Sequence, residues 1–136
     1  MPLMGPLSVY LETTNICNFK CVFCPESFAS YSEISGGFFR LSSDDFSRVA
    51  DQLAEVGTVK TLNFYMMGEP FANRDLLSFV SEAKRKKVAE RIIVTSNGSL
   101  IKPKLYDDLC KTQLDTFASP STAQMKRSSG RARPVR

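Results

Sequence analysis

Three cysteines, Cys17, Cys21 and Cys24, are crowded into eight residues near the start of the chain. Thiolates are soft ligands that bind iron-sulfur clusters, zinc or copper(I), and three so close together exceed what packing requires. Structural zinc sites and protein iron-sulfur clusters normally take four protein ligands. The trio therefore predicts a metal site with one coordination position left open, at which a ligand can bind and react.

The simpler alternative is a zinc site or a buried cluster of cysteines. Zinc would require a fourth ligand, and because the sequence contains no histidine, the one remaining thiolate is Cys110. We expect Cys110 to belong to the core, beside Tyr106 and Leu109 on the apolar side of a helix. From the residues alone, an enzyme with an open cluster and a noncatalytic iron-sulfur or zinc-binding module for electron transfer both stay possible.

Two further polar segments follow predicted strands. Gly68-Glu69-Pro70 comes after the apolar segment 59–67, and Ser96-Asn97 comes after Ile92-Ile93-Val94. A glycine at a strand exit permits close approach of the backbone to a ligand, and a carboxylate there can accept hydrogen bonds from an ammonium group. Each segment is also compatible with an ordinary turn. At the carboxyl ends of parallel strands both would face the same mouth as the cysteines.

Cys17, Cys21, Phe23 and Cys24 resemble the Cys-x3-Cys-x-aromatic-Cys signature of the radical S-adenosylmethionine (radical SAM) superfamily. Met67-Gly68-Glu69-Pro70 resembles its Gly-Gly-Glu-Pro motif, with methionine in place of the first glycine. The resemblance extends over residues 7–117. It implies that the three cysteines hold three irons of a 4Fe-4S cluster and that S-adenosylmethionine binds the fourth. The reduced cluster would then cleave this cofactor to a 5'-deoxyadenosyl radical that abstracts hydrogen from a substrate.

The resemblance also implies roles for other residues and partners. Phe23 would lie beside the adenine of S-adenosylmethionine, and an electron donor such as flavodoxin or ferredoxin would reduce the cluster. The remaining implied cofactor contacts are Gly68, Glu69, Pro70, Ser96 and Asn97. The opening segment 11–21 is similar to members that carry a C-terminal auxiliary-cluster (SPASM-like) domain and act on peptides or peptide-like substrates.

The hydrophobic pattern predicts an α/β fold. Strands are expected at residues 7–11, 59–67 and 92–94, the second of them covered on both faces. Helices are expected from a Ser42 cap to Gly57, from an Asn73 cap over residues 74–89, and from Pro103 onward. A complete (β/α)8 barrel needs about 250 residues. The 136 residues therefore predict a partial (β/α) barrel of about three βα units, with the third strand left as an exposed edge.

The chain divides by composition into a core domain, 1–118, and a tail, 119–136, rich in Ser, Arg and Lys, which we expect to be disordered. We interpret the sequence as a barrel interrupted by a truncated or frameshifted gene. Because half of the cofactor pocket would then be missing, we expect weak or no activity from this chain alone. The net charge of +4 belongs to the tail, which has no interleaved aromatic residues, so nucleic acid is an unlikely partner.

Composition excludes several other classes. The absence of histidine removes Ser-His-Asp triads and Cys2His2 zinc sites. The first residues form no secretory signal, and no window reaches the roughly 18 apolar residues of a membrane span. We therefore expect a cytoplasmic protein whose cysteines stay reduced.

Overall fold

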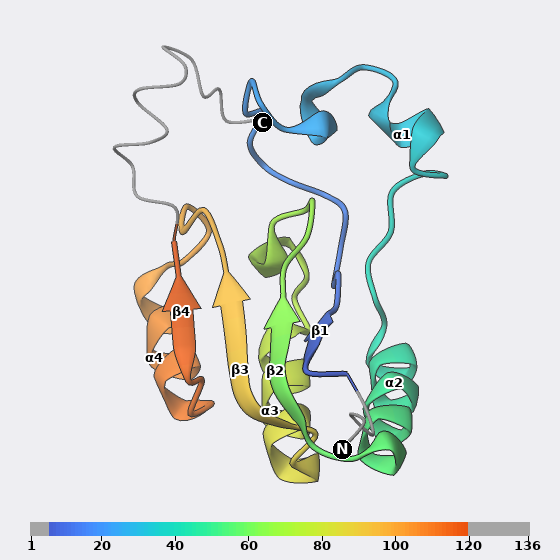
Figure 1. Cartoon of the computed structure of the whole chain (residues 1–136). Helices are drawn as coiled ribbons and strands as arrows, with labels where there is room; N and C mark the ends of the chain where they lie inside the picture. Colours follow the sequence, from blue (N-terminus) through green and yellow to red (C-terminus); the bar gives the residue numbers. More distant parts are fainter. Residues whose placement is uncertain (1–5, 120–136) are drawn as a thin grey trace.

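Four parallel strands form one sheet in the computed structural model, which describes residues 6–119 (Figure 1). The strands are β1 (Ser8–Tyr10), β2 (Val59–Phe64), β3 (Ala89–Thr95) and β4 (Thr116–Ala118), and they lie in this order across the sheet. Val9 pairs with Leu62, which pairs in turn with Ile92. Parallel neighbours in sequence order, joined by helices, confirm the predicted α/β fold and partial barrel.

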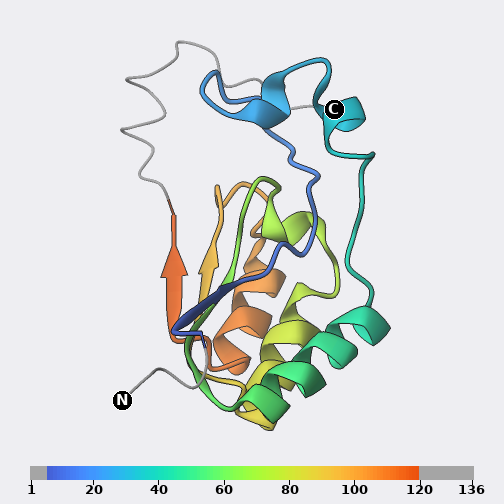
Figure 2. The same ribbon diagram turned by 45° about the vertical axis from the view of Figure 1, so that its right-hand side comes forward.

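Three helices connect the strands and cover one face of the sheet (Figure 2). They are α2 (Ser43–Val56), α3 (Leu76–Lys86) and α4 (Pro103–Lys111). The predicted cap of α2 is confirmed, because Ser42 Oγ accepts a hydrogen bond from Asp45 N at 3.1 Å. Three short helices lie outside this layer: η1 (Pro25–Ser27), α1 (Tyr31–Ile34) and η2 (Pro70–Ala72). Among residues 6–119, no helix has the length and apolar character needed to cross a membrane.

The core lies between the sheet and these helices. Phe46 of α2 stacks on Phe79 of α3 with ring centroids 4.6 Å apart, and Phe46 also contacts Phe64 of β2 at 5.8 Å. Leu62 and Ile92 complete this layer from the strands and are fully buried. Burial of these large side chains is the main source of stability in such a layer.

Several element boundaries differ from those predicted. β2 ends at Phe64, not at residue 67, and the helices cover only one of its faces. α3 is shorter than predicted at both ends. It begins at Leu76, and it ends before Lys87, which adopts a left-handed conformation (φ 52°), so that Ala89 already belongs to β3. Asn73 does not cap α3 directly; its Oδ1 accepts from the backbone N of Asp75, the residue that precedes the helix.

The edge of the sheet also differs from the prediction. β4 pairs with β3, so β3 is internal and β4 is an edge of the described sheet. Cys110 on α4 is exposed, so its predicted place in the core is wrong. It lies with Tyr106 and Phe117 along a hollow beside this edge, where no further described element covers it. Apart from Ser119, the predicted tail lies outside the described residues.

Asp115 connects three elements immediately before β4. Its Oδ2 accepts hydrogen bonds from Lys84 Nζ in α3 at 2.5 Å and from Ile92 N in β3 at 2.7 Å. Burial by itself would raise the pKa of Asp115, but these hydrogen bonds and the nearby positive charges of Lys84 and Arg91 outweigh it and hold the pKa below its ordinary value.

A carboxyl whose folded pKa is lowered stabilises the fold above its unfolded pKa of about 3.9 and loses that contribution as pH falls through the folded pKa. We therefore expect Asp115→Asn to lower the urea midpoint at neutral pH and to flatten the loss of stability between about pH 5 and pH 1. Asp108→Asn, which removes only a surface pair with Lys111, is the control and should change little. Equal pH profiles for wild type and Asp115→Asn would contradict this role.

Candidate functional site

A cavity of about 590 Å³ lies where the carboxyl ends of β2 and β3 meet the loop after β1. The loop after β1 contributes the three cysteines with Phe19 and Phe23, the segment that follows β2 contributes residues 65–69, and the end of β3 with its exit contributes residues 95–97. Every predicted site residue except Pro70 lines this one cavity. Pro70 is buried at the first position of η2, directly behind Glu69. The cavity volume falls in the range of about 300–1,000 Å³ that is common for small-molecule sites.

The three thiols lie in the cysteine loop, residues 16–28, and each is half-buried and free of disulfide bonds. Cys24 N donates to Cys21 O at 3.0 Å, which closes a tight turn between these two cysteines. Phe19 N donates to Cys17 Sγ at 3.4 Å. Burial raises the pKa of the Cys17 and Cys21 thiols, helped at Cys21 by the charge of Cys24. A positive charge beside these thiols, such as that of a metal ion, would favour loss of their protons.

An ion pair fixes the shape of the cysteine loop. Lys20 Nζ donates to Glu26 Oε1 and to Glu26 O, both at 2.7 Å, and the Glu26 side chain is almost fully buried. Ser27 Oγ donates to Cys21 O on the same turn. Lys20 therefore orients the loop through its contacts with Glu26.

The base of the loop is held by the segment that follows β1. Thr14 Oγ1 donates to Phe39 O at 2.7 Å, and Asn15 hydrogen bonds both Gly37 O and Phe39 N. Thr13, Thr14 and Asn15 are each 2% exposed. These contacts join the segment that enters the loop to the segment that leaves it, and they hold the cysteines at the carboxyl ends of the strands.

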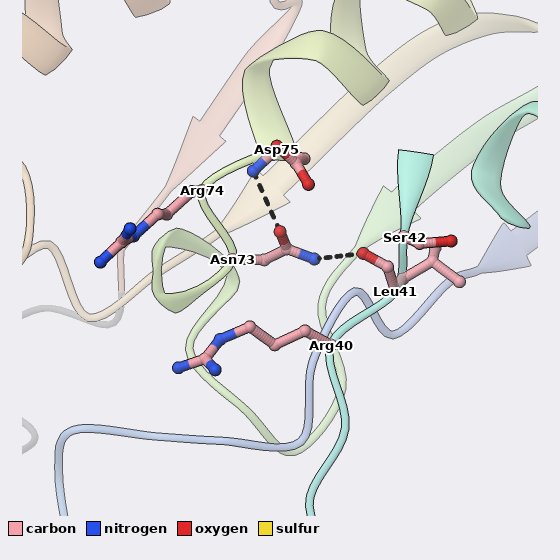
Figure 3. Close-up of a pocket in the computed structure, with 6 residues that line it drawn as sticks. All are labelled: Arg40, Leu41, Ser42, Asn73, Arg74 and Asp75. Atoms are coloured by element: carbon pink, nitrogen blue, oxygen red, sulfur yellow. Dashed lines mark hydrogen bonds between the residues drawn. The ribbon is translucent and has the colours of Figure 1, made fainter. Parts of the chain in front are cut away.

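Asn73 ties this base to the start of α3. Its Nδ2 donates to Thr13 O at 2.9 Å and to Leu41 O at 3.0 Å. Figure 3 shows Asn73 between Leu41 and Asp75 in a second hollow, of about 550 Å³, with the Arg40 and Arg74 side chains extending to the same side. This hollow contains no cysteine, and its arginines are exposed. The buried Asn73 amide holds the base of the loop against the start of α3, so we interpret this hollow as structural and not as a ligand site.

Gly68 is required by close packing. A Cβ at this position would lie 2.0 Å from Thr14 O and 2.9 Å from Asn15 C, both backbone atoms. Glu12 Oε1 accepts from Met67 N at 2.8 Å and from Gly68 N at 3.3 Å, and Glu69 N donates to Ile16 O. The exit of β2 is thereby packed against the entrance to the cysteine loop.

Glu69 joins the exits of β2 and β3. Its side chain is buried, and Oε1 accepts from Ser96 Oγ at 2.6 Å and from Phe71 N at 3.2 Å. Oε2 accepts from Asn97 N at 2.8 Å. A carboxylate offers about four acceptor positions, so three bonds leave one for a donor in the cavity. Phe23, in contrast, is 69% exposed and lies on the rim.

The soft donors at this cavity are the three thiols. Within residues 6–119, no three Cys, Asp or Glu side chains stand close enough to hold one metal ion. A zinc ion at about 2.3 Å from each sulfur needs its thiolates gathered tightly, whereas a cluster attaches each thiolate to a different iron. Three thiols line this one cavity, and thiolates are ligands for iron-sulfur clusters and for zinc.

Sequence reasoning did not assign Glu12, Asn73 or Lys20 to the site. None of them belongs to a metal-ligand or cofactor pattern, and each acts through a hydrogen bond to residues distant in the chain or six residues away. Glu12 had one usable signal, its position at the exit of the first predicted strand.

The fold and the site together define a partial (β/α) barrel with a three-cysteine loop at the carboxyl ends of its strands. A family model described as the Radical SAM superfamily matches residues 11–120. The chain belongs to this superfamily of enzymes, as the cysteine and Gly68-Glu69-Pro70 motifs predicted.

Two solved structures share the fold. A crystal structure of BtrN in complex with AdoMet and 2-DOIA is 19% identical with a TM-score of 0.72, over 93% of this chain and 52% of that one. A structure of selenomethionine BtrN in an open conformation is 18% identical with a TM-score of 0.69, over 91% of this chain and 60% of that one. The chain thus spans between half and three fifths of the length of these proteins.

Proposed function

We propose that this chain provides the cluster- and cofactor-binding part of a radical SAM enzyme. It would bind a 4Fe-4S cluster through Cys17, Cys21 and Cys24 and S-adenosylmethionine beside it, to generate a 5'-deoxyadenosyl radical for hydrogen abstraction. The observation that carries this proposal is the single cavity that three half-buried thiols share with the exits of β2 and β3. The BtrN complex, of the same fold, contains AdoMet.

In this proposal the cysteine loop holds the irons, and the exit of β2 holds the amino group of the cofactor. The remaining acceptor position of Glu69 and the nearby backbone carbonyls suit an ammonium group. Ser96 would support Glu69, because its Oγ already donates to that carboxylate and accepts from Gly98 N. Phe23, on the rim, would lie along the adenine, and Pro70 would fix the turn behind Glu69. When bound, the cluster and cofactor supply one-electron radical chemistry.

The partners of the whole enzyme are part of the same proposal. A flavodoxin or ferredoxin would deliver the electron to the cluster. A peptide or peptide-like substrate, and a SPASM-like domain in the full-length enzyme, rest only on the opening segment 11–21.

Anaerobic reconstitution separates this proposal from a noncatalytic iron-sulfur or electron-transfer module. We expect the 136-residue chain to take up iron and sulfide, and the electron paramagnetic resonance (EPR) spectrum of the reduced cluster to change when S-adenosylmethionine is added. A spectrum indifferent to S-adenosylmethionine would favour the noncatalytic module, and uptake of zinc without sulfide would favour a zinc site.

A further inference from the structure

Asn97 connects two parts of the cavity wall that are 80 residues apart in the sequence. Its side-chain Nδ2 lies 3.9 Å from Cys17 Sγ and 3.0 Å from Asn18 Oδ1, both on the cysteine loop. Its backbone N donates to Glu69 Oε2 at 2.8 Å. One residue therefore contacts the first cysteine and the carboxylate at the exit of β2.

The orientation of the Asn97 amide is fixed from behind. Ser99 N and Ser99 Oγ both donate to Asn97 Oδ1, at 2.9 and 2.6 Å. Because the amide oxygen is engaged there, the NH2 group faces the cysteine loop. Its two hydrogens can serve Asn18 Oδ1 and the Cys17 sulfur at the same time.

We propose that Asn97 is a positioning residue for Cys17, whose thiolate receives an N–H···S hydrogen bond from the Asn97 amide. This inference rests on the proposed function, in which Cys17 binds an iron of the cluster, and it moves Asn97 from cofactor contact to support of the cluster ligand. Hydrogen bonds to cluster sulfurs stabilise the more negative, reduced state and raise the reduction potential.

The surroundings of Cys17 make such a donor important. Cys17 is half-buried, which limits the hydrogen bonds that water can donate to its sulfur. Phe19 N donates one hydrogen bond to this sulfur at 3.4 Å. The Asn97 amide is the side-chain donor that the described structure places at this sulfur.

The test compares Asn97→Ala and the near-isosteric Asn97→Asp with wild type. The complete chain is reconstituted anaerobically, its iron is counted, and the cluster is titrated with redox mediators while the EPR signal of the reduced form is followed. At the wild-type midpoint, we expect the ratio of reduced to oxidised cluster to fall about fivefold in Asn97→Ala, the equivalent of one net hydrogen bond. In Asn97→Asp the ratio of reduced to oxidised cluster should fall further, because a carboxylate replaces the donor.

Asn18→Ala is the matched control. It removes Asn18 Oδ1 as the second acceptor and the contact of Asn18 Nδ2 with Ser99 Oγ, but it leaves the sulfur, Asn97 and the hydrogen bond from Ser99 N to Asn97 Oδ1 in place. It should keep the wild-type potential. A shift in Asn18→Ala as large as that in Asn97→Ala would overturn the inference, because the effect would then come from the link between loop and strand. Unchanged potentials in both Asn97 variants would overturn it as well.

The outcomes also separate this inference from the proposed function. A wild-type chain that takes up no cluster overturns both, whereas a normal wild-type cluster whose potential ignores Asn97 overturns the inference alone. If Asn97→Ala retains the wild-type circular dichroism spectrum but loses iron, the positioning role is supported. If Asn97→Ala does not fold, Asn97→Asp decides, because it retains the contacts to Ser99 and Glu69.

Discussion

Replacement of Cys21 by alanine is expected to abolish cluster binding. The remaining thiols, Cys17 and Cys24, would leave two of the irons without a protein ligand, and clusters with so few thiolates are not normally retained. Iron content after anaerobic reconstitution should fall from about four per chain to a small fraction of one. The broad visible absorption of the cluster should disappear with it.

Cys110→Ala is the matched control for this substitution. Cys110 is exposed on α4 and does not line the cavity that holds the other three cysteines. We expect Cys110→Ala to retain the wild-type iron and sulfide content. If instead Cys110→Ala loses its metal, Cys110 is a fourth ligand and no iron is open to a cofactor.

Gly68→Ala is expected to damage both stability and cofactor binding. The new Cβ would meet the Thr14 carbonyl oxygen at 2.0 Å, and no flexible side chain can yield because the nearest atoms are all backbone. Overpacking of this kind typically costs about 1–3 kcal/mol. The exit of β2 must shift away from the cysteine loop, so the contacts of Glu12 with Met67 N and Gly68 N are lost as well. Urea unfolding and titration of the reconstituted protein with S-adenosylmethionine measure the two effects.

Gly36→Ala distinguishes this steric effect from a general cost of replacing glycine. Gly36 lies just after α1 with φ +76° and open space around its Cβ position. Its replacement should cost about 1–2 kcal/mol through left-handed strain while leaving S-adenosylmethionine binding unchanged. Wild-type affinity for S-adenosylmethionine in Gly68→Ala would contradict the packing argument.

Much of the fold could be predicted because its signals are local. The Ser42 cap of α2 depends only on residues at the start of that helix, and it is confirmed. The boundaries of β2 and α3 were wrong because tertiary contacts decide them. Ala89 continued the helical pattern of α3, but Lys87 turns left-handed and Ala89 pairs with Val59. Propensity is a weak signal against such pairing.

The candidate site residues were easier to predict from the sequence than the residues that hold them in place. Cysteines at short spacing and a glycine-acid pair after a strand can be recognised in the sequence from their residue types and spacing. Glu12 and Asn73 are ordinary polar residues until the fold brings Glu12 to Met67 N and Asn73 to Thr13 O. Cys110 illustrates the same limit. The apolar helix face around it predicted a buried position, but the described sheet does not cover this residue.

The central claim is that three thiolates leave one iron of the cluster open to S-adenosylmethionine. Mössbauer spectroscopy of the wild-type chain, reconstituted with iron-57, tests it most directly. The account predicts that the signal of one iron in four changes when S-adenosylmethionine is added, because its coordination changes, while the other three stay as they were. Four irons that all remain unchanged, or a preparation that contains zinc in place of iron, would contradict it.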